Sequence, residues 1–297
     1  MMNILHISDL HFGPYFVSHV ADALLSKLAE LDADILINSG DYTQRARREQ
    51  FEEAARFNKL LPQIPTIQVP GNHDVPLYRV FERMFAPYKL YREYISPDLD
   101  LVLRHEQAVI VALNSTAPYR AIVNGRIRSS QLDLCTRIFT EVPKGILRIV
   151  VAHHHFAPAP DYEGGQVMPN AKRAIDRFTQ LGVDLVLGGH MHRAYIGNSL
   201  DVYPGEDREH GIIIVQSGTS TSRRGRARER EKNSFNYLQI GEDVTRVTHY
   251  MYFEDAKGFE PISRHIFPLT GRHYLRDAPA QTPPAGARDT DLKVPGT

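Results

Sequence analysis

The chain has 297 residues, of which 42% are hydrophobic, which is enough for a sizeable core in one large α/β domain or two small ones. Lysine plus arginine and aspartate plus glutamate number 35 each, so the formal charge is zero and no global field favours DNA, RNA or an anionic membrane. The single cysteine, Cys135, excludes internal disulfides and cysteine-rich metal sites and fits a reducing compartment.

The N-terminal part of the chain predicts a β-α-β unit. Residues 3–8 and 34–40 are short apolar runs, which are typical of strands buried on both faces. Between them, the apolar residues from Val17 to Leu31 keep the i, i+3, i+4, i+7 spacing of an amphipathic helix. We find no signal peptide and no window of roughly 20 apolar residues, and therefore expect a cytoplasmic protein with no membrane partner.

The rest of the chain continues this alternation and then changes. Further apolar runs predict strands at residues 65–70, 108–114, 146–152, 184–189 and 211–217. Helices are expected at 51–61, at 132–139, where Ser130 and Asp133 have the spacing of a capping box, and at 171–181. Strands at 234–240 and 244–253 then follow without intervening helices. This order predicts a layered α/β fold whose last part adds antiparallel strands.

Two C-terminal segments have unusual composition. Residues 271–297 are poor in apolar residues and rich in Pro, Ala and Gly, which predicts a disordered tail after a domain covering residues 1–270. The arginine-rich segment 222–232 also contains Glu229 and Glu231, which favours a solvated loop. A basic lip over a phosphate site is the alternative interpretation.

Polar clusters follow five of the predicted strands at the point where each strand ends. They are Ser8-Asp9-Leu10-His11, Gly40-Asp41, Gly71-Asn72-His73-Asp74, His153-His154-His155 and Gly188-Gly189-His190-Met191-His192. Because ligands in open α/β sheets gather at the carboxyl ends of the strands, we expect these clusters to form one site.

The residue types in these clusters indicate metal binding. In an extended chain, residues i and i+2 project to the same side, so Asp9 with His11, and His190 with His192, each offer two ligands to one place. Mixed imidazole and carboxylate ligands suit Zn²⁺, Mn²⁺ or iron, and the lack of cysteine disfavours a structural zinc. The candidate ligands are Asp9, His11, Asp41, Asn72, His153, His190 and His192.

Seven ligands are more than one tetrahedral ion uses, which predicts two metal ions that share a bridging carboxylate. Such a pair clamps both oxygens of an in-line phosphoryl displacement. Each residue taken alone has a structural alternative: Asp9 as a helix cap, Asn72 as a turn residue, and Gly40 and Gly71 as turn glycines. Only the whole set, at strand ends and with this spacing, favours the metal centre.

In this order, the motifs Asp9-x-His11, Gly40-Asp41, Gly71-Asn72-His73-Asp74, His153 and Gly189-His190-x-His192 resemble the calcineurin-like metallophosphoesterase superfamily. The resemblance covers residues 3 to about 220. It implies a four-layer α/β/β/α sandwich, in which two mixed sheets are flanked by helices.

The resemblance also implies roles for individual residues. One metal ion is held by Asp9, His11 and His192, the other by Asn72, His153 and His190, and Asp41 bridges them. The ions are Mn²⁺, Fe²⁺/Fe³⁺ or Zn²⁺, and a hydroxide between them attacks phosphorus. His73 stabilises the developing charge or protonates the leaving oxygen, and Asp74 orients His73.

The triple histidine departs from the family pattern "HHPP" or "HSP", in which the first histidine after the strand is the ligand. That position is His153, but His155 and Phe156 replace the prolines, and strand alternation allows His155 to share the face of His153. His154 is either a packed residue or one that supports the ligands or contacts substrate.

The local sequences also narrow the expected reaction. Serine/threonine phosphatases of the superfamily carry GDxVDRG and GNHE, whereas this chain has "GDYTQR" and "GNHD". The segments "SDLHFG", "GDYTQRARREQF" and "VPGNHDVPL" resemble a bacterial branch that includes class III cyclic nucleotide phosphodiesterases. This implies hydrolysis of a small phosphodiester such as a 3′,5′-cyclic nucleotide, with Arg45, His154 and Asn114 as candidate substrate contacts.

Other functions stay open at this stage. One is a catalytically silent scaffold that keeps the fold and binds a protein partner. Others are enzymes of the same fold that act on nucleotide-sugar pyrophosphates or on nucleic acid, although zero net charge disfavours a polynucleotide. A homodimer is one assembly that the sequence allows.

Overall fold

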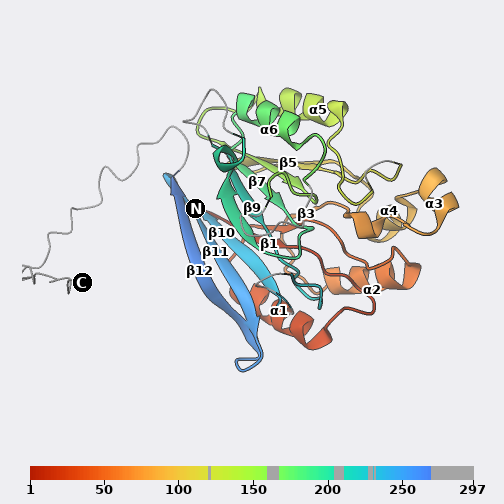
Figure 1. Cartoon of the computed structure of the whole chain (residues 1–297). Coiled ribbons are helices and arrows are strands. Elements are labelled where there is room, and N and C mark those ends of the chain that lie inside the picture. The colour runs from red at the N-terminus through yellow and green to blue at the C-terminus, as the bar shows by residue number, and fades with distance from the viewer. Residues whose placement is uncertain (120–121, 159–166, 204–210, 227–229, 231, 269–297) are drawn as a thin grey trace, which may run out of the picture.

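The computed structural model describes residues 1–119, 122–158, 167–203, 211–226, 230 and 232–268 (Figure 1). The predicted tail at residues 271–297 lies outside this range, as do Glu229 and Glu231 of the arginine-rich segment. Within the described residues, no helix is both long and apolar enough to cross a membrane.

Two six-stranded mixed sheets form the centre of the fold. The first has the order β12-β11-β10-β1-β2-β3, and the second has the order β4-β5-β6-β7-β9-β8. The first consists of β1 (Met2–Ile7), β2 (Ile35–Asn38), β3 (Thr66–Gln68), β10 (Ser234–Ile240), β11 (Val244–Phe253) and β12 (Gly258–Pro268). The second consists of β4 (Leu101–Arg104), β5 (Ala108–Leu113), β6 (Leu147–Ala152), β7 (Leu185–Gly188), β8 (Tyr195–Asn198) and β9 (Ile213–Gln216).

Helices cover the outer face of each sheet. Apolar residues of α1 (Ser18–Glu30) and α2 (Arg48–Asn58) share one core with the first sheet, and those of α5 (Ser129–Phe139) and α6 (Ala171–Gln180) share another with the second. A third core lies between the sheets. Strand alternation sorts the side chains: Ile4 of β1 faces the inter-sheet core, whereas Leu5 faces α1 and α2. The predicted four-layer sandwich is confirmed (Figure 1).

The parallel strands position the site. β1, β2 and β3 are parallel to one another, as are β5, β6, β7 and β9, so their carboxyl ends lie at one edge of each sheet. β10, β11 and β12 add antiparallel strands beside β1, as predicted for the last part of the chain.

Several elements were not predicted, most of them short. They are β4, β8, β12 and the helices α3 (Val80–Phe85) and α4 (Lys89–Tyr94), together with the 3-10 turns η1 (Asn72–Asp74) and η2 (Ser199–Asp201). The predicted capping box at Ser130 and Asp133 is wrong. Helix α5 begins at Ser129, and the Gln131 side chain instead accepts a hydrogen bond from the backbone N–H of Arg128 at 2.8 Å.

Candidate metal centre

The loops that follow β1, β2, β3, β6 and β7 meet between the carboxyl ends of the two sheets. The backbone N–H of His190 donates to Asp9 Oδ2 at 2.9 Å, across 181 positions of sequence, and that of His73 donates to Asp41 Oδ1 at 2.8 Å. The five polar clusters therefore form one site, as expected from their positions at strand ends.

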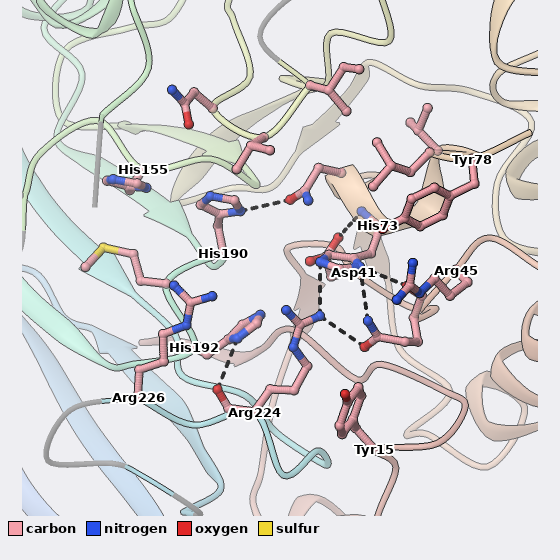
Figure 2. A pocket seen from close by; sticks show the side chains of 18 residues that line it. Tyr15, Asp41, Arg45, His73, Tyr78, His155, His190, His192, Arg224 and Arg226 are labelled. Atoms are coloured by element: carbon pink, nitrogen blue, oxygen red, sulfur yellow. Dashed lines mark hydrogen bonds between the residues drawn. The ribbon is translucent and has the colours of Figure 1, made fainter. Parts of the chain in front are cut away.

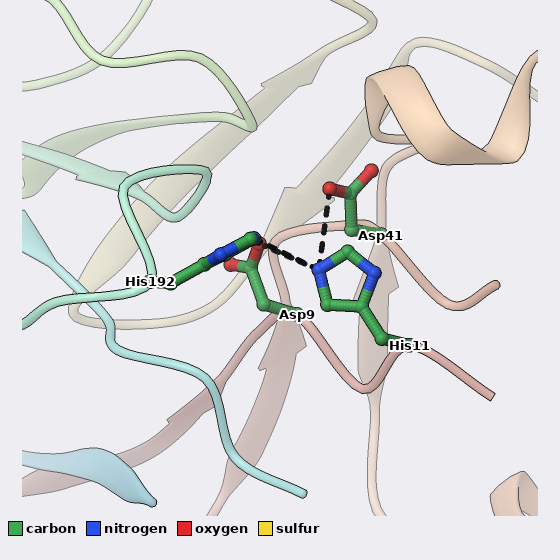
Figure 3. A group of neighbouring side chains, drawn as sticks. All are labelled: Asp9, His11, Asp41 and His192. Carbon is green, nitrogen blue, oxygen red and sulfur yellow. Dashed lines mark hydrogen bonds and ion pairs between the residues drawn. The ribbon is translucent and has the colours of Figure 1, made fainter. Parts of the chain in front are cut away.

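The first group of candidate ligands comprises Asp9, His11, Asp41 and His192, whose ligand atoms all lie within 4.8 Å of one another (Figure 3). Nε2 of His192 lies 3.1 Å from Asp9 Oδ1 and 2.9 Å from Nε2 of His11. Nε2 of His11 lies 3.6 Å from Asp41 Oδ2. All four residues are buried.

The second group comprises Asp41, His153 and His190. Nε2 of His153 lies 3.4 Å from Asp41 Oδ2. Oδ1 of Asn72 lies 2.9 Å from Nδ1 of His190 and 3.3 Å from Nε2 of His153. All seven predicted ligands thus come together, and Asp41 belongs to both groups.

The protonation of these side chains fits a cation rather than direct hydrogen bonding between ligands. Nδ1 of His192 lies 3.1 Å from the carbonyl oxygen of Arg224, and Nδ1 of His153 lies 2.8 Å from that of Ser39. Since a carbonyl only accepts, each Nδ1 donates, which leaves Nε2 as the ring atom that faces the carboxylates and would bind a cation. Among the described residues, Asp9 Oδ1 and Asp41 Oδ2 accept no hydrogen bond although both are buried. Imidazole nitrogens that converge with carboxylate oxygens accepting no hydrogen bond are the kind of ligand set that a metal ion takes.

The carboxylates of the site also favour positive charge beside them. Burial raises the pKa of Asp9, but His192, His11 and His153 lower it by more, so this pKa lies well below its usual value. Asp41 shows the same balance through His153 and His73. Burial lowers the pKa of His153, but Asp41 raises it to about 9. The proton that this pKa places on His153 supplies positive charge beside Asp41 in the metal-free site, and a bound cation would take its place.

Most of the candidate ligands sit on backbone in the left-handed region. The φ angles are 55° at Asp9, 52° at His11, 57° at Asp41, 73° at His190 and 53° at His192. Non-glycine residues rarely adopt such angles, and such angles concentrate at functional sites.

The backbone also approaches the carboxylates of Asp9 and Asp41 so closely that only glycine fits. A Cβ on Gly71 would lie 2.1 Å from Asp41 Oδ1, and one on Gly189 would lie 2.5 Å from Asp9 Oδ2.

His73 lies beside the two groups, but its ring is held differently from the prediction. Nδ1 of His73 donates to the carbonyl oxygen of Gln44 at 2.8 Å, and its Nε2 accepts from Nη1 of Arg224 at 3.0 Å. The carboxylate of Asp74 instead accepts from the backbone N–H groups of Tyr42, Thr43 and Gly71 at 2.9 to 3.1 Å. Asp74 therefore fixes the loops after β2 and β3, and Gln44 and Arg224 orient His73.

A pocket of about 440 Å³ opens over both ligand groups (Figure 2). Arg45, Arg224 and Arg226 line it together with Tyr15 and Tyr78. The guanidinium carbon of Arg45 lies 4.7 Å from the ring centroid of Tyr78, and that of Arg224 lies 5.9 Å from the ring centroid of Tyr15. The pocket thus combines a ligand-rich floor with cationic and aromatic walls.

Only one of the three predicted substrate contacts lies at this pocket. Arg45 lines the pocket. Among the described residues, His154 and Asn114 do not line it. Nδ1 of His154 lies 2.8 Å from Ser115 Oγ, and its ring lies against that of His190, with centroids 4.7 Å apart. Asn114 is buried and accepts hydrogen bonds from Thr116. Both support the surrounding loops in the described structure, and their role as substrate contacts stays a prediction.

His155 and the arginine-rich segment contribute more than the favoured interpretations allowed. His155 lines the pocket and stacks on His190, with centroids 5.5 Å apart, while His153 supplies the ligand atom. Arg224 and Arg226 also line the pocket, so the described part of the segment forms its edge. The solvated-loop interpretation is wrong for Arg224, and the basic lip describes its position better.

Comparison with known proteins supports the same fold. A family model described as calcineurin-like phosphoesterase matches residues 2–194. A search of curated proteins found no match. Among solved structures, the purple acid phosphatase PPD1 from yellow lupin (Lupinus luteus) is 12% identical with a TM-score of 0.63, and the match covers 90% of this chain. That match spans 53% of the plant enzyme, so the chain corresponds to about half of its length.

Two further structures resemble the chain over a larger share of their own length. A dimetal phosphatase from Danio rerio has a TM-score of 0.60 at 12% identity, covering 90% of this chain and 98% of that one. The structure named PhoD has a TM-score of 0.61 at 12% identity, covering 88% of this chain and 71% of that one. At these identities the likeness shows a shared fold. Together with the family match over residues 2–194, it shows that the chain belongs to the calcineurin-like phosphoesterase family.

Proposed function

We propose that this protein is a dinuclear metal-dependent phosphoric diester hydrolase. The observation that carries the proposal is the position of Asp41, whose Oδ2 lies 3.6 Å from Nε2 of His11 and 3.4 Å from Nε2 of His153. One carboxylate thus belongs to both ligand groups on the floor of a cationic pocket. A metal-free scaffold would have no need to bury these charges.

The residues divide into two metal sites and a substrate site. One ion would be held by Asp9, His11 and His192, and the other by Asn72, His153 and His190. Asp41 would bind both ions. Two bound cations supply water activation and stabilisation of charge on the phosphoryl oxygens. Arg224, whose guanidinium lies beside His73, would bind a non-bridging phosphate oxygen. His73 would stabilise or protonate the leaving oxygen once the guanidinium turns to the phosphate.

A small diester fits the pocket better than a polymer. The pocket volume of about 440 Å³ is typical of a site for one small molecule, and the arginines that line the pocket favour an anionic substrate. The sequence resemblance makes a 3′,5′-cyclic nucleotide the first natural substrate to test. Tyr15 and Tyr78 supply aromatic surface for the part of the substrate that extends from the phosphate.

The test compares metal content and diesterase activity in the same preparations. The Mn²⁺-loaded protein is expected to bind about two ions per chain and to hydrolyse bis-(p-nitrophenyl) phosphate faster than p-nitrophenyl phosphate. Asp41→Asn should lower activity by about 10³-fold or more and reduce the bound metal. Asp176→Asn, on the exposed side of α6, is the matched control. Full activity of Asp41→Asn, or of metal-free protein, would exclude this site as the catalytic centre.

A further inference from the structure

One wall of the pocket is apolar and faces the solvent. Leu77 and Tyr78 follow η1, and Ile122 and Val123 follow β5, and all four line the pocket. The exposed fractions are 38% for Leu77, 70% for Tyr78 and 59% for Val123. Figure 2 shows Tyr78 on the far side of Asp41 and His73 from Arg226, so this part of the apolar wall lies across the pocket from that arginine.

Exposed apolar side chains continue along the chain from this wall into helix α3, which begins two residues after Tyr78. Within the described chain, no residue of α3 is buried, and Phe81 and Phe85 are 81% and 79% exposed. The guanidinium of Arg83 donates to the carbonyl oxygen of Leu77, and the hydroxyl of Tyr119 donates to that of Met84 at 3.0 Å. Helix α3 is therefore tied to both segments that supply the apolar wall. The wall and α3 together are called the apolar rim below.

The apolar rim needs an occupant, because contiguous exposed apolar surface is costly in water and marks a binding site in most proteins. A compact substrate held inside the pocket would cover the wall but leave Phe81 and Phe85 exposed. A second copy of the chain would cover α3 but would leave the wall beside the ligand groups unfilled. A flexible apolar chain that leaves the pocket along the rim would cover both.

We propose that the substrate is an amphiphilic phosphodiester, with its phosphate at the metal centre and a long alkyl or acyl chain along the apolar rim. This inference rests on the proposed function and narrows its substrate class. Water adds to phosphorus, the bond between phosphorus and the leaving-group oxygen breaks, and the products are an alcohol and a phosphomonoester that keeps the chain. A cyclic nucleotide, which has no such chain, would be a poor substrate by comparison.

The test is a series of p-nitrophenyl alkyl phosphodiesters with ethyl, butyl and octyl groups, used below their micelle-forming concentrations. Each fully buried methylene is worth roughly 0.8 kcal/mol, or about fourfold in affinity, so partial burial of six methylenes predicts at least about a tenfold rise in kcat/KM from ethyl to octyl. Phe81→Gln/Phe85→Gln should flatten this rise and leave the ethyl ester unaffected. Ile262→Gln/Ile266→Gln on β12, where the two residues are 44% and 59% exposed, is the matched control and should keep the rise.

The outcomes distinguish failure of this inference from failure of the proposed function on which it rests. Equal kcat/KM across the series, or a preference for cyclic AMP over the octyl ester, would overturn the inference and leave the diesterase in place. No hydrolysis of any ester by protein carrying two metal ions would overturn the proposed function and the inference together. If Phe81→Gln/Phe85→Gln converts a dimer to a monomer on size-exclusion chromatography and the rise persists, α3 is an interface between copies and the inference is wrong.

Discussion

Nη1 of Arg224 lies 3.0 Å from Nε2 of His73, although 151 positions separate the two residues in sequence. The same Nη1 donates to Gln44 Oε1 at 3.0 Å. The guanidinium therefore occupies the atom of His73 that would meet the leaving oxygen. Burial and the charge of Arg224 also lower the pKa of His73, which keeps the ring neutral in this arrangement. A phosphate that draws Arg224 away would free Nε2 and remove one cause of the lowered pKa, so that Nε2 could take up a proton from water before giving it to the leaving oxygen.

Replacing Arg224 should therefore weaken substrate binding more than it slows the chemical step. Arg224→Met is expected to raise KM for bis-(p-nitrophenyl) phosphate by about 10- to 100-fold, because a charge-assisted contact to phosphate is lost. The exposed neighbour Arg223, whose backbone N–H donates to the carbonyl oxygen of Tyr15, supplies the control Arg223→Met. Steady-state kinetics of both variants decide the point. An unchanged KM in Arg224→Met would show that the guanidinium does not bind the phosphate.

The role of His73 can be read from its dependence on the leaving group. If His73 protonates the leaving oxygen, His73→Gln should slow hydrolysis of a dialkyl phosphodiester by about 10²-fold or more. Loss of p-nitrophenolate, which leaves without a proton, should slow much less. Comparing kcat for the two esters tests this. An equal loss on both would assign His73 to stabilisation of charge instead.

The backbone of Gly71 lies too close to Asp41 to leave room for a side chain. A Cβ there would lie 2.4 Å from the Asp41 backbone nitrogen and 2.1 Å from its Oδ1, so Gly71→Ala must displace the shared carboxylate. We expect at least a tenfold loss of metal affinity, measured by competition with a chromogenic chelator. Gly258→Ala is the control, because its nearest neighbour in the described structure lies at an ordinary 3.6 Å. Retained affinity in Gly71→Ala would contradict the rigid placement of Asp41.

The predicted ligands come together in the structure, but only one of the two reasons for expecting this holds. Alternation along an extended strand was used to bring Asp9 and His11 together, yet both residues adopt left-handed φ angles of 55° and 52°. Their side chains meet because the loop after β1 turns sharply, which alternation does not describe. The strand-end argument succeeded because parallel strands bury long apolar runs whose ends are visible in sequence.

The pocket walls were harder to predict, because they depend on tertiary contacts. Arg224 lies in a charged segment that resembles any solvated loop, and tertiary contacts with Gln44, His73 and Tyr15 hold it over the site. Helix α3 has six residues, too few for a hydrophobic period to stand out. The edge strand β4, with four residues, gave an equally weak signal. The ring of His154 turns towards Ser115, on the loop after β5, which the packed interpretation of this residue describes.

If the site binds metal ions as proposed, their removal should destabilise the fold, since the ions would balance the charge of buried carboxylates. Excess EDTA is expected to lower the melting temperature by several degrees, and added Mn²⁺ should restore it by mass action. Calorimetry with and without chelator measures the shift. Because Asp41→Asn weakens metal binding, its melting temperature should respond much less to EDTA. An equal response would place the stabilising metal elsewhere.

Asp184 offers a test of stability against pH away from the metal centre. Burial raises its pKa to about 6 from 3.8, although its Oδ2 accepts a hydrogen bond from the backbone N–H of Arg148 at 2.8 Å. The folded state therefore binds more protons than the unfolded state between these two pKa values, and the contribution of Asp184 to the free energy of unfolding falls as pH rises through this window.

Asp184→Asn keeps an acceptor for Arg148 and removes the charge. After allowance for partial exposure, the variant should be more stable than the parent by about 1 to 2 kcal/mol at pH 8 and equally stable near pH 4. Urea unfolding of both proteins across this range measures the difference, with Asp255→Asn in an exposed turn as the control. A difference that does not change with pH would show that the Asp184 carboxyl ionises alike in the folded and unfolded chains.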